Sequence, residues 1–207
     1  MNVAFAEILR SRPMNLFVQM FLAVIWGSFA YVHFKTFMKT HEPALLVICI
    51  AEAFAVAFFI SRSSPKSISM VPFDWVVAVA GTVAPLFLRP ASWGVLPVAS
   101  NLIIIGALIQ LMGLISLNRS FAIVAAKREI KTKGMYRYVR HPLYASYVLT
   151  FGAYLLTHST LWNLLVYTVV VACIAIRISR EENHLAQDPL YREYMEQVRY
   201  RVVPFVY

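Results

Sequence analysis

Apolar segments long enough to cross a lipid bilayer recur through almost the whole chain. A hydrocarbon layer about 30 Å thick requires roughly 20 apolar residues in an α-helix. Such windows cover residues 14–34, 43–61, 71–88 and 95–117, and a longer apolar stretch follows at 143–178. With 60% hydrophobic and 14% charged residues, the chain is too apolar for an ordinary soluble domain. We therefore expect an all-α, polytopic transmembrane helical bundle.

The stretch 143–178 is too long for one span. As a single helix it would extend over about 50 Å, and the polar segment "LLTHST" (155–160) interrupts it near the middle. We predict a helical hairpin with arms at about 142–157 and 160–178. The first arm is short enough to make a re-entrant hairpin a possible alternative to a full span.

The basic residues gather on one side of the expected spans. Sixteen of the 19 Lys and Arg flank one side, and only Lys35, Lys39 and Arg89 flank the other. Only an even number of crossings produces this distribution, and the positive-inside rule makes the basic side cytoplasmic. The net charge of +9 then reflects orientation, with attraction to anionic membrane lipids as a secondary effect. We expect no nucleic-acid partner.

Two features of the apolar segments exclude simpler interpretations. The first window is too long for the core of a signal peptide, so we expect an uncleaved first helix. Cys49 and Cys173 both lie in apolar spans, so we interpret them as small buried hydrophobic side chains and not as a disulfide or metal-binding pair. The sequence shows no clustered His/Cys signature, and we expect no metal site.

The remaining polar residues lie in two places, the loop 118–141 and the tail that begins at Arg177. A hairpin over 142–178 returns His141 and Glu181 to the same membrane face. We therefore expect two parts: about four transmembrane helices in 1–117, and a loop, hairpin and cytoplasmic polar tail in 118–207 that close a polar site.

Three motifs in the second part resemble a known family. "GMYRYVRHPLY" (134–144), "RISREENHL" (177–185) and "YREYMEQVRYRVVPF" (191–205) are similar to the carboxyl-terminal half of the integral-membrane methyltransferases, which include the isoprenylcysteine carboxyl methyltransferases and the phospholipid N-methyltransferases. The resemblance covers roughly 120–205. It implies S-adenosylmethionine bound between loop, hairpin and tail, and a lipophilic small-molecule or lipidated acceptor that enters from the bilayer.

The resemblance also implies roles for individual residues. It places Arg177 near the acceptor, and we add Glu181 as the second catalytic candidate because an amine acceptor would need a base. It implies cofactor contacts at Tyr136, His141, Pro142, Leu143, Tyr144 and Glu181. The chain departs from the carboxyl methyltransferases at Phe121, where a glutamine is expected, and at 128–131, which read Arg-Glu-Ile-Lys.

The chemistry of the cofactor agrees with these positions and adds two. An adenine ring favours aromatic faces such as Tyr136 and Tyr144. Glu181 or Glu182 could bind its hydroxyl or ammonium groups, and Arg140 or His141 its carboxylate. Pro142 suits the first turn of a helix, whose free amides would face an anionic group.

The sequence says least about the chemical class of the methyl acceptor. A carboxylate needs no base and would be oriented by Arg177, and we favour it. A phospholipid amine would need a base, for which Glu181, Glu182 and His184 are candidates. Glu52 lies within an apolar span, where a carboxylate is costly, and both a functional and a packing role remain open for it.

Other readings stay open at this point. The arginines could be orientation anchors, the tyrosines an interfacial belt, His141 a helix cap, and Glu181 and Glu182 a solvated pair. "VRYRVVPFVY" (198–207) also resembles the tail of NADPH-dependent membrane sterol reductases. A non-catalytic membrane subunit is the third class.

Overall fold

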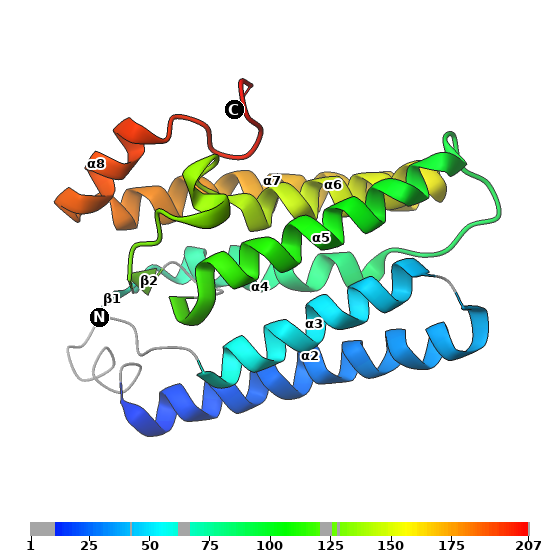
Figure 1. Cartoon of the computed structure of the whole chain (residues 1–207), viewed down its shortest axis with the longest axis horizontal. Coiled ribbons are helices and arrows are strands. Elements are labelled where there is room, and N and C mark those ends of the chain that lie inside the picture. The colour runs from blue at the N-terminus through cyan, green and yellow to red at the C-terminus, as the bar shows by residue number, and fades with distance from the viewer. Residues whose placement is uncertain (1–10, 42, 62–66, 121–125, 128, 207) are drawn as a thin grey trace.

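The helices lie side by side as a bundle with its loops at two ends (Figure 1). The structure is a computed structural model, and it describes residues 11–41, 43–61, 67–120, 126–127 and 129–206, without the side chains of 44, 119, 126 and 127. The α-helices are α2 (Arg12–Thr40), α3 (Pro43–Ser61), α4 (Pro72–Val83), α5 (Ser100–Leu117), α6 (Pro142–Thr157), α7 (Leu161–Leu185) and α8 (Pro189–Gln197). The predicted all-α bundle is confirmed.

Short elements join these helices. The 3-10 helices are η1 (Ala84–Phe87), η2 (Pro97–Ala99), η3 (Asn118–Ser120) and η4 (Gly134–Arg137). Strands β1 (Ser67–Ile68) and β2 (Ala126–Lys127) pair in antiparallel fashion, with Ser67 opposite Lys127. Both strands lie at the same end of the bundle as α8 (Figure 1).

Three described helical segments are long and apolar enough to cross a membrane: α2, Pro97–Leu117 and α7. Leu45–Ser61 and Pro72–Phe87 are shorter apolar helices. Helix α2 also presents large apolar side chains outward, among them Phe17 (65% exposed) and Val24 (64% exposed). In a membrane protein such side chains face lipid, so this surface fits the hydrocarbon of a bilayer.

Local sequence determines where the hairpin helices begin and end. Pro142 occupies the first turn of α6, where a missing N–H costs nothing. After the interruption, Thr160 starts α7 by accepting a hydrogen bond at Oγ1 from the Asn163 amide, at 3.0 Å. The predicted hairpin with a break near 157–160 is therefore confirmed.

Packing proceeds around the bundle from helix to helix. Helix α2 packs on α3, α3 on α5, α5 on α6, α6 on α7, and α7 on α4. Within the described part of the chain, α4 makes few contacts with α2 or α3. The ring of packed helices is therefore loosest between α4 and the α2–α3 pair.

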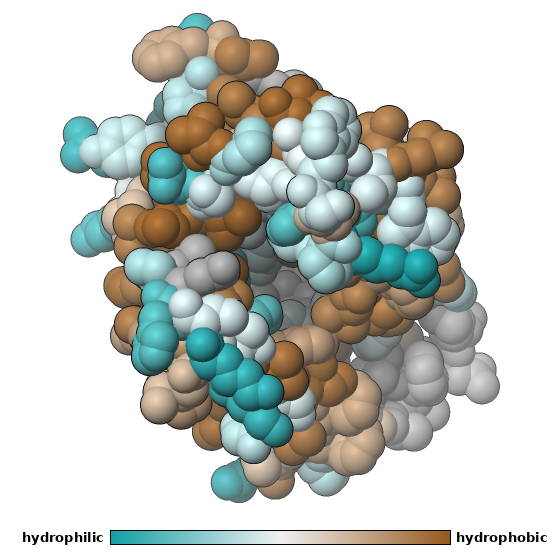
Figure 2. All heavy atoms as spheres, turned by 90° about the vertical axis from the view of Figure 1, so that its right-hand side faces the viewer, coloured by the Kyte–Doolittle hydropathy of each residue, from teal (hydrophilic) through white to brown (hydrophobic). Residues whose placement is uncertain are grey.

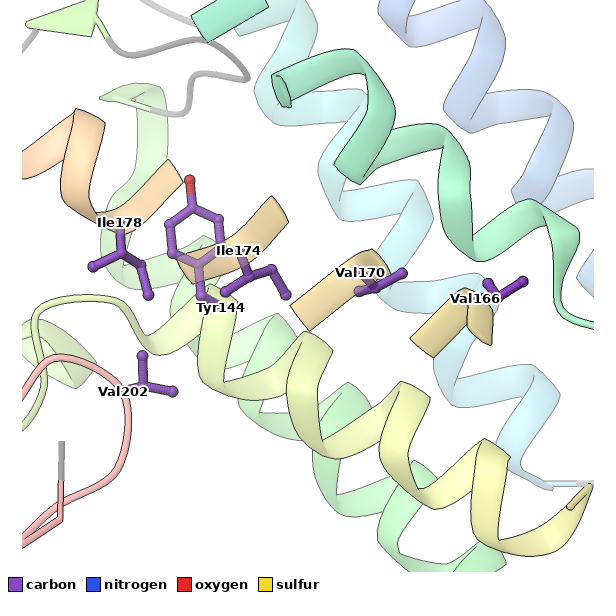
Figure 3. Packing of buried hydrophobic residues seen from close by; sticks show 6 residues of the cluster. All are labelled: Tyr144, Val166, Val170, Ile174, Ile178 and Val202. Atoms are coloured by element: carbon purple, nitrogen blue, oxygen red, sulfur yellow. The ribbon is translucent and has the colours of Figure 1, made fainter. Parts of the chain in front are cut away.

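One row of buried apolar side chains runs along α7. Its members are spaced four residues apart, so they share one face of the helix. Figure 3 shows this row against one residue of α6 and one of the carboxyl-terminal tail. The cluster comprises Val166, Val170, Ile174 and Ile178 with Tyr144 and Val202. It holds the tail against the start of α6.

Candidate active site

A glycine turn carries the chain from the loop into the site. Gly134 has φ +64°, a conformation that side chains disfavour, and a Cβ there would lie 2.4 Å from Ser116 Oγ. That hydroxyl accepts a hydrogen bond from the Met135 amide at 3.1 Å. The contact docks η4 on α5 and buries Tyr136, whose carbonyl oxygen accepts a hydrogen bond from the Tyr194 hydroxyl at 2.6 Å.

Glu182 ties three segments together with both of its oxygens. Its Oε1 accepts from Arg140 Nε at 2.8 Å and lies 3.0 Å from His141 Nε2. Its Oε2 accepts from Arg201 Nε at 2.9 Å. Arg140, His141 and Glu182 are each less than 10% exposed. Charges this deeply buried are tolerated only when paired, so the set holds the start of α6, the end of α7 and the tail as one unit.

Backbone contacts extend this clamp to the tail. The amides of Arg140 and His141 donate to the carbonyl oxygens of Tyr200 and Arg201, at 2.9 and 2.8 Å. Arg140 Nη1 donates to the Val198 carbonyl at 2.8 Å, just after the end of α8. A guanidinium at the carboxyl end of a helix satisfies its free carbonyl groups.

Glu181, the neighbour of Glu182, points elsewhere. Its Oε2 accepts a hydrogen bond from the Tyr144 hydroxyl at 2.9 Å. The Arg177 guanidinium lies one helical turn earlier, with its carbon 5.1 Å from the centre of the Tyr144 ring. This distance suits a cation–π contact. As the i, i+4 spacing predicts, Arg177 and Glu181 share one face of α7.

Arg180 contacts the first turn of α4, and His184 contacts the strand before it. Arg180 Nε donates to the buried carboxylate of Asp74, which also accepts from Ser69. His184 Nε2 lies 3.0 Å from Ser67 Oγ in β1. These contacts fasten the beginning of α4 to the end of α7. His184 does not line the cavity described next.

A cavity of about 1010 Å³ starts at this site and continues into the bundle. Its polar end is lined by Tyr136, Arg140, His141, Tyr144, Arg177, Glu181, Tyr191 and Tyr194. The wall then becomes mainly apolar and includes residues of α2 to α7. At the other end it reaches Asn101 and His158, where Figure 2 shows the molecule hollowed near the centre, with apolar side chains around much of the rim.

Three tyrosines outside the membrane-spanning helices make the polar end a neutral aromatic wall. Burial raises the pKa of Tyr136, of Tyr191 and of Tyr194 above the ordinary value for a phenol. The nearby carboxylate of Glu181 raises the pKa of Tyr191 further. These phenols therefore stay protonated at physiological pH and offer aromatic faces and neutral hydroxyl groups.

The structure separates the predicted site residues into two groups. Tyr136, Arg140, His141, Leu143, Tyr144, Arg177 and Glu181 line the cavity. Glu182 and Pro142 are buried but do not line it. Phe121 and Arg128, where the chain departs from the carboxyl methyltransferases, lie outside the described residues.

Many cavity residues were not among the predicted site residues, and four of them lie close to those that were. Tyr191 and Tyr194 stand three residues apart in "YREY", a helical spacing that would have placed them on one face of α8. Tyr147 follows Tyr144 by three residues on α6. Gly81 has no sequence signal, because only the packing shows that a Cβ there would lie 3.6 Å from the Arg177 side chain.

Comparison with known proteins covers the same part of the chain. Residues 94–192 match the family described as phospholipid methyltransferase. The matched region includes α5, α6, α7 and the first part of α8, and with them most of the polar end of the cavity. No curated protein matches the chain. Over residues 94–192 the chain is therefore similar to the phospholipid methyltransferases, and this similarity supports an enzyme with methyltransferase activity.

Proposed function

We propose that the chain transfers a methyl group from S-adenosylmethionine to a lipophilic carboxylate held in the membrane cavity. The cofactor enters at the polar end, which we place on the cytoplasmic face, and the acceptor comes from the bilayer. The observation that carries this proposal is the continuity of the cavity. One space joins the polar end, at Tyr136 and Glu181, to an apolar interior that reaches Asn101.

The residues at the polar end fit this cofactor. S-adenosylmethionine supplies an electrophilic methyl group on a positively charged sulfur. Tyr136, Tyr144, Tyr191 and Tyr194 offer aromatic faces for an adenine ring or a cation. Glu181 Oε1 makes no hydrogen bond within the described part of the chain and can accept one from a hydroxyl or ammonium group. The first amides of α6 have no partner within the helix and favour a carboxylate.

Glu182 has a different role in this proposal. Both of its oxygens accept hydrogen bonds from cationic side chains of the chain itself. We therefore place Glu182 among the groups that hold the site together, with Pro142 at the start of α6. Arg140 belongs to both sets, because it pairs with Glu182 and also lines the cavity.

Arg177 supports a carboxylate acceptor. Its guanidinium lies over the Tyr144 ring at the polar end of the cavity. A planar guanidinium matches a carboxylate with two parallel hydrogen bonds. Within a membrane helix such a cation is retained where it serves an anionic group, and the proposed acceptor is one.

The proposed reaction requires no general acid or base from the protein. An ionised carboxylate attacks the methyl group directly, so no base is required. The chain contributes alignment of the two reactants and a wall that excludes water. The clamp around Glu182 supplies the rigidity, because it fixes the start of α6 relative to the end of α7.

A phospholipid amine is the second candidate, and the description of the matched family favours it. In that case Arg177 would bind the phosphate of the headgroup. Glu181 is the base candidate that lines the cavity, whereas Glu182 and His184 do not. The larger lipid would have to enter where the helix ring is loosest, between α4 and the α2–α3 pair.

One assay separates these functions. Protein in lipid nanodiscs is incubated with S-adenosylmethionine labelled in the methyl group, and with either long-chain acids or phosphatidylethanolamine. A methyl ester releases labelled methanol in base, whereas an N-methyl group does not. We expect base-labile product with acids. Base-stable product from phosphatidylethanolamine alone would establish the second candidate.

A binding measurement on the same sample tests the cofactor. We expect S-adenosylhomocysteine to bind and NADPH not to bind. Binding of NADPH without S-adenosylhomocysteine would overturn the proposal in favour of the reductase reading.

A further inference from the structure

A hydrogen-bonded pair of ionisable side chains joins two membrane helices, away from the polar end of the cavity. His33 Nδ1 of α2 lies 2.8 Å from Glu52 Oε2 of α3. Glu52 lies in a strongly apolar stretch of α3, where an ionisable group is costly to keep, and His33 lies near the end of the apolar window of α2. Neither residue belongs to the matched region 94–192, so the methyltransferase domain does not account for them.

The pair faces the cavity instead of being sealed between the two helices. His33 and Glu52 both line the same space as Arg177 and Glu181, next to the aromatic rings of Trp26 and Phe29. The side chain of His33 keeps 32% of its surface exposed and that of Glu52 keeps 14%. The α2–α3 interface has a separate polar contact nearby, from Cys49 Sγ to the Ala30 carbonyl.

The pair also retains hydrogen-bonding capacity. Within the described part of the chain, Glu52 Oε1 makes no hydrogen bond. In a neutral imidazole whose Nδ1 donates to Glu52, the other ring nitrogen, Nε2, is an acceptor. The pair therefore offers two acceptors to the cavity, and an apolar chain placed beside them would leave both without partners. Such unsatisfied groups are costly inside a membrane.

We propose that Glu52 and His33 form a distal subsite that binds a hydrogen-bond donor, a hydroxyl or an amine, on the part of the acceptor remote from the methylated group. This rests on the proposed function, because it assumes that the acceptor occupies the cavity. The acceptor is then polar at both ends and apolar between them. A plain hydrocarbon tail is selected against.

The test compares acceptors that differ in one group. Fatty acids and ω-hydroxy fatty acids of equal length, over a series of lengths, are bound to the protein in nanodiscs. For one chain length in the series, the ω-hydroxyl should lower the Kd of the wild type about tenfold. This is the gain expected from one hydrogen bond to a charged group. In Glu52→Leu the improvement should vanish. An equal improvement in both proteins, or none at any length, would overturn the proposal.

Two further variants keep the result interpretable. Gln110→Leu removes another polar cavity residue and should leave the hydroxyl improvement unchanged. Glu52→Gln keeps the shape and one acceptor, so it should retain part of the improvement even where Glu52→Leu fails to fold. A complete loss in Gln110→Leu would move the subsite away from Glu52.

A second set of probes separates this inference from the proposed function. Alkanols and the matching α,ω-diols carry no carboxylate, so they test the distal subsite alone. If diols gain affinity through Glu52 while no acid is methylated, the carboxylate acceptor is wrong and the subsite stands. If acids are methylated without any distal preference, the subsite is wrong and the function stands. ω-Amino acids, compared with ω-hydroxy acids, decide between amine and hydroxyl.

Discussion

The carboxylates of Glu182 and Glu52 lie in opposite kinds of surroundings. Glu182 contacts two arginines and a histidine, which occupy both of its oxygens, and it does not line the cavity. Glu52 has one partner, at one oxygen, and its side chain borders the cavity. Glu181 resembles Glu52, with one oxygen bonded to Tyr144. A carboxylate satisfied on both oxygens holds the fold, whereas one with a free oxygen in a cavity can bind a ligand.

The largest effect expected is an all-or-none difference between the two ends of the bundle. In a protein with Cys49 and Cys173 changed to Ala, single cysteines at the exposed positions Lys133 and Glu196 should be labelled only from the cytoplasmic side. A cysteine at Lys39 is the control and should be labelled only from the other side. If the cysteines at Lys133 and Glu196 were labelled from opposite sides, the loop and the tail could not form one site.

Glu182→Ala should give the largest loss of stability. It removes the shared partner of Arg140, His141 and Arg201 and leaves the buried Arg140 guanidinium without its carboxylate. We expect a loss of about 3–5 kcal/mol in the free energy of unfolding, measured by denaturant titration in detergent. Glu196→Ala, at an exposed position, should change it by about 0.5 kcal/mol or less. Equal values for the two variants would contradict the assignment of Glu182 to the fold.

Glu181→Ala should show the converse pattern. Its carboxylate lines the cavity and makes one hydrogen bond with the chain, to Tyr144. We expect the affinity for S-adenosylhomocysteine to fall about 10- to 100-fold, as for the loss of a charge-assisted hydrogen bond, measured by calorimetry. Stability should fall much less than in Glu182→Ala. An unchanged affinity would remove Glu181 from the cofactor site.

The different surroundings of Glu181 and Glu182 could be predicted from the sequence only in part. Adjacent residues on a helix point about 100° apart, so the sequence shows that "EE" offers two directions but not which one faces the cavity. That depends on Arg140 and Arg201, which approach from other segments. Both glutamates were therefore predicted as cofactor contacts, and the structure leaves only Glu181 in the wall.

The spans themselves were more accessible to prediction, because their length is set by the bilayer. The window 43–61 coincides with α3, and the break before Leu161 was visible in "LLTHST". The window 71–88 was less accurate. Helix α4 ends at Val83, and η1, which contains Pro85, continues the apolar segment. Proline cannot donate the backbone hydrogen bond that a longer α-helix would need there.

Arg177→Leu tests the acceptor side of the site. The variant loses the fork of donors that would hold a carboxylate, so kcat/KM for a long-chain acid should fall about tenfold or more. Affinity for S-adenosylhomocysteine should stay within about twofold, and Arg177→Lys should recover only part of the loss because it keeps charge without the fork. Wild-type activity of Arg177→Leu on every acid tested would exclude this role for Arg177.

The smallest effect distinguishes two tyrosines of α8 that both line the cavity. Tyr194 donates its hydroxyl proton to the Tyr136 carbonyl at 2.6 Å, whereas the hydroxyl of Tyr191 has no partner within the described residues. Tyr194→Phe should therefore lower the free energy of unfolding by about 1 kcal/mol. Tyr191→Phe should leave that free energy nearly unchanged.

Cofactor affinity then shows what the Tyr191 hydroxyl does. A hydroxyl that faces the cavity without a partner in the chain is available to the cofactor, so Tyr191→Phe should weaken S-adenosylhomocysteine several-fold, about the value of one neutral hydrogen bond. Tyr194→Phe should weaken it less, because its hydroxyl is already used by the fold. The reverse order of the two affinities would mean that satisfaction within the chain does not separate structural from ligand-binding groups at this site, and the contrast between Glu182 and Glu181 would lose its basis.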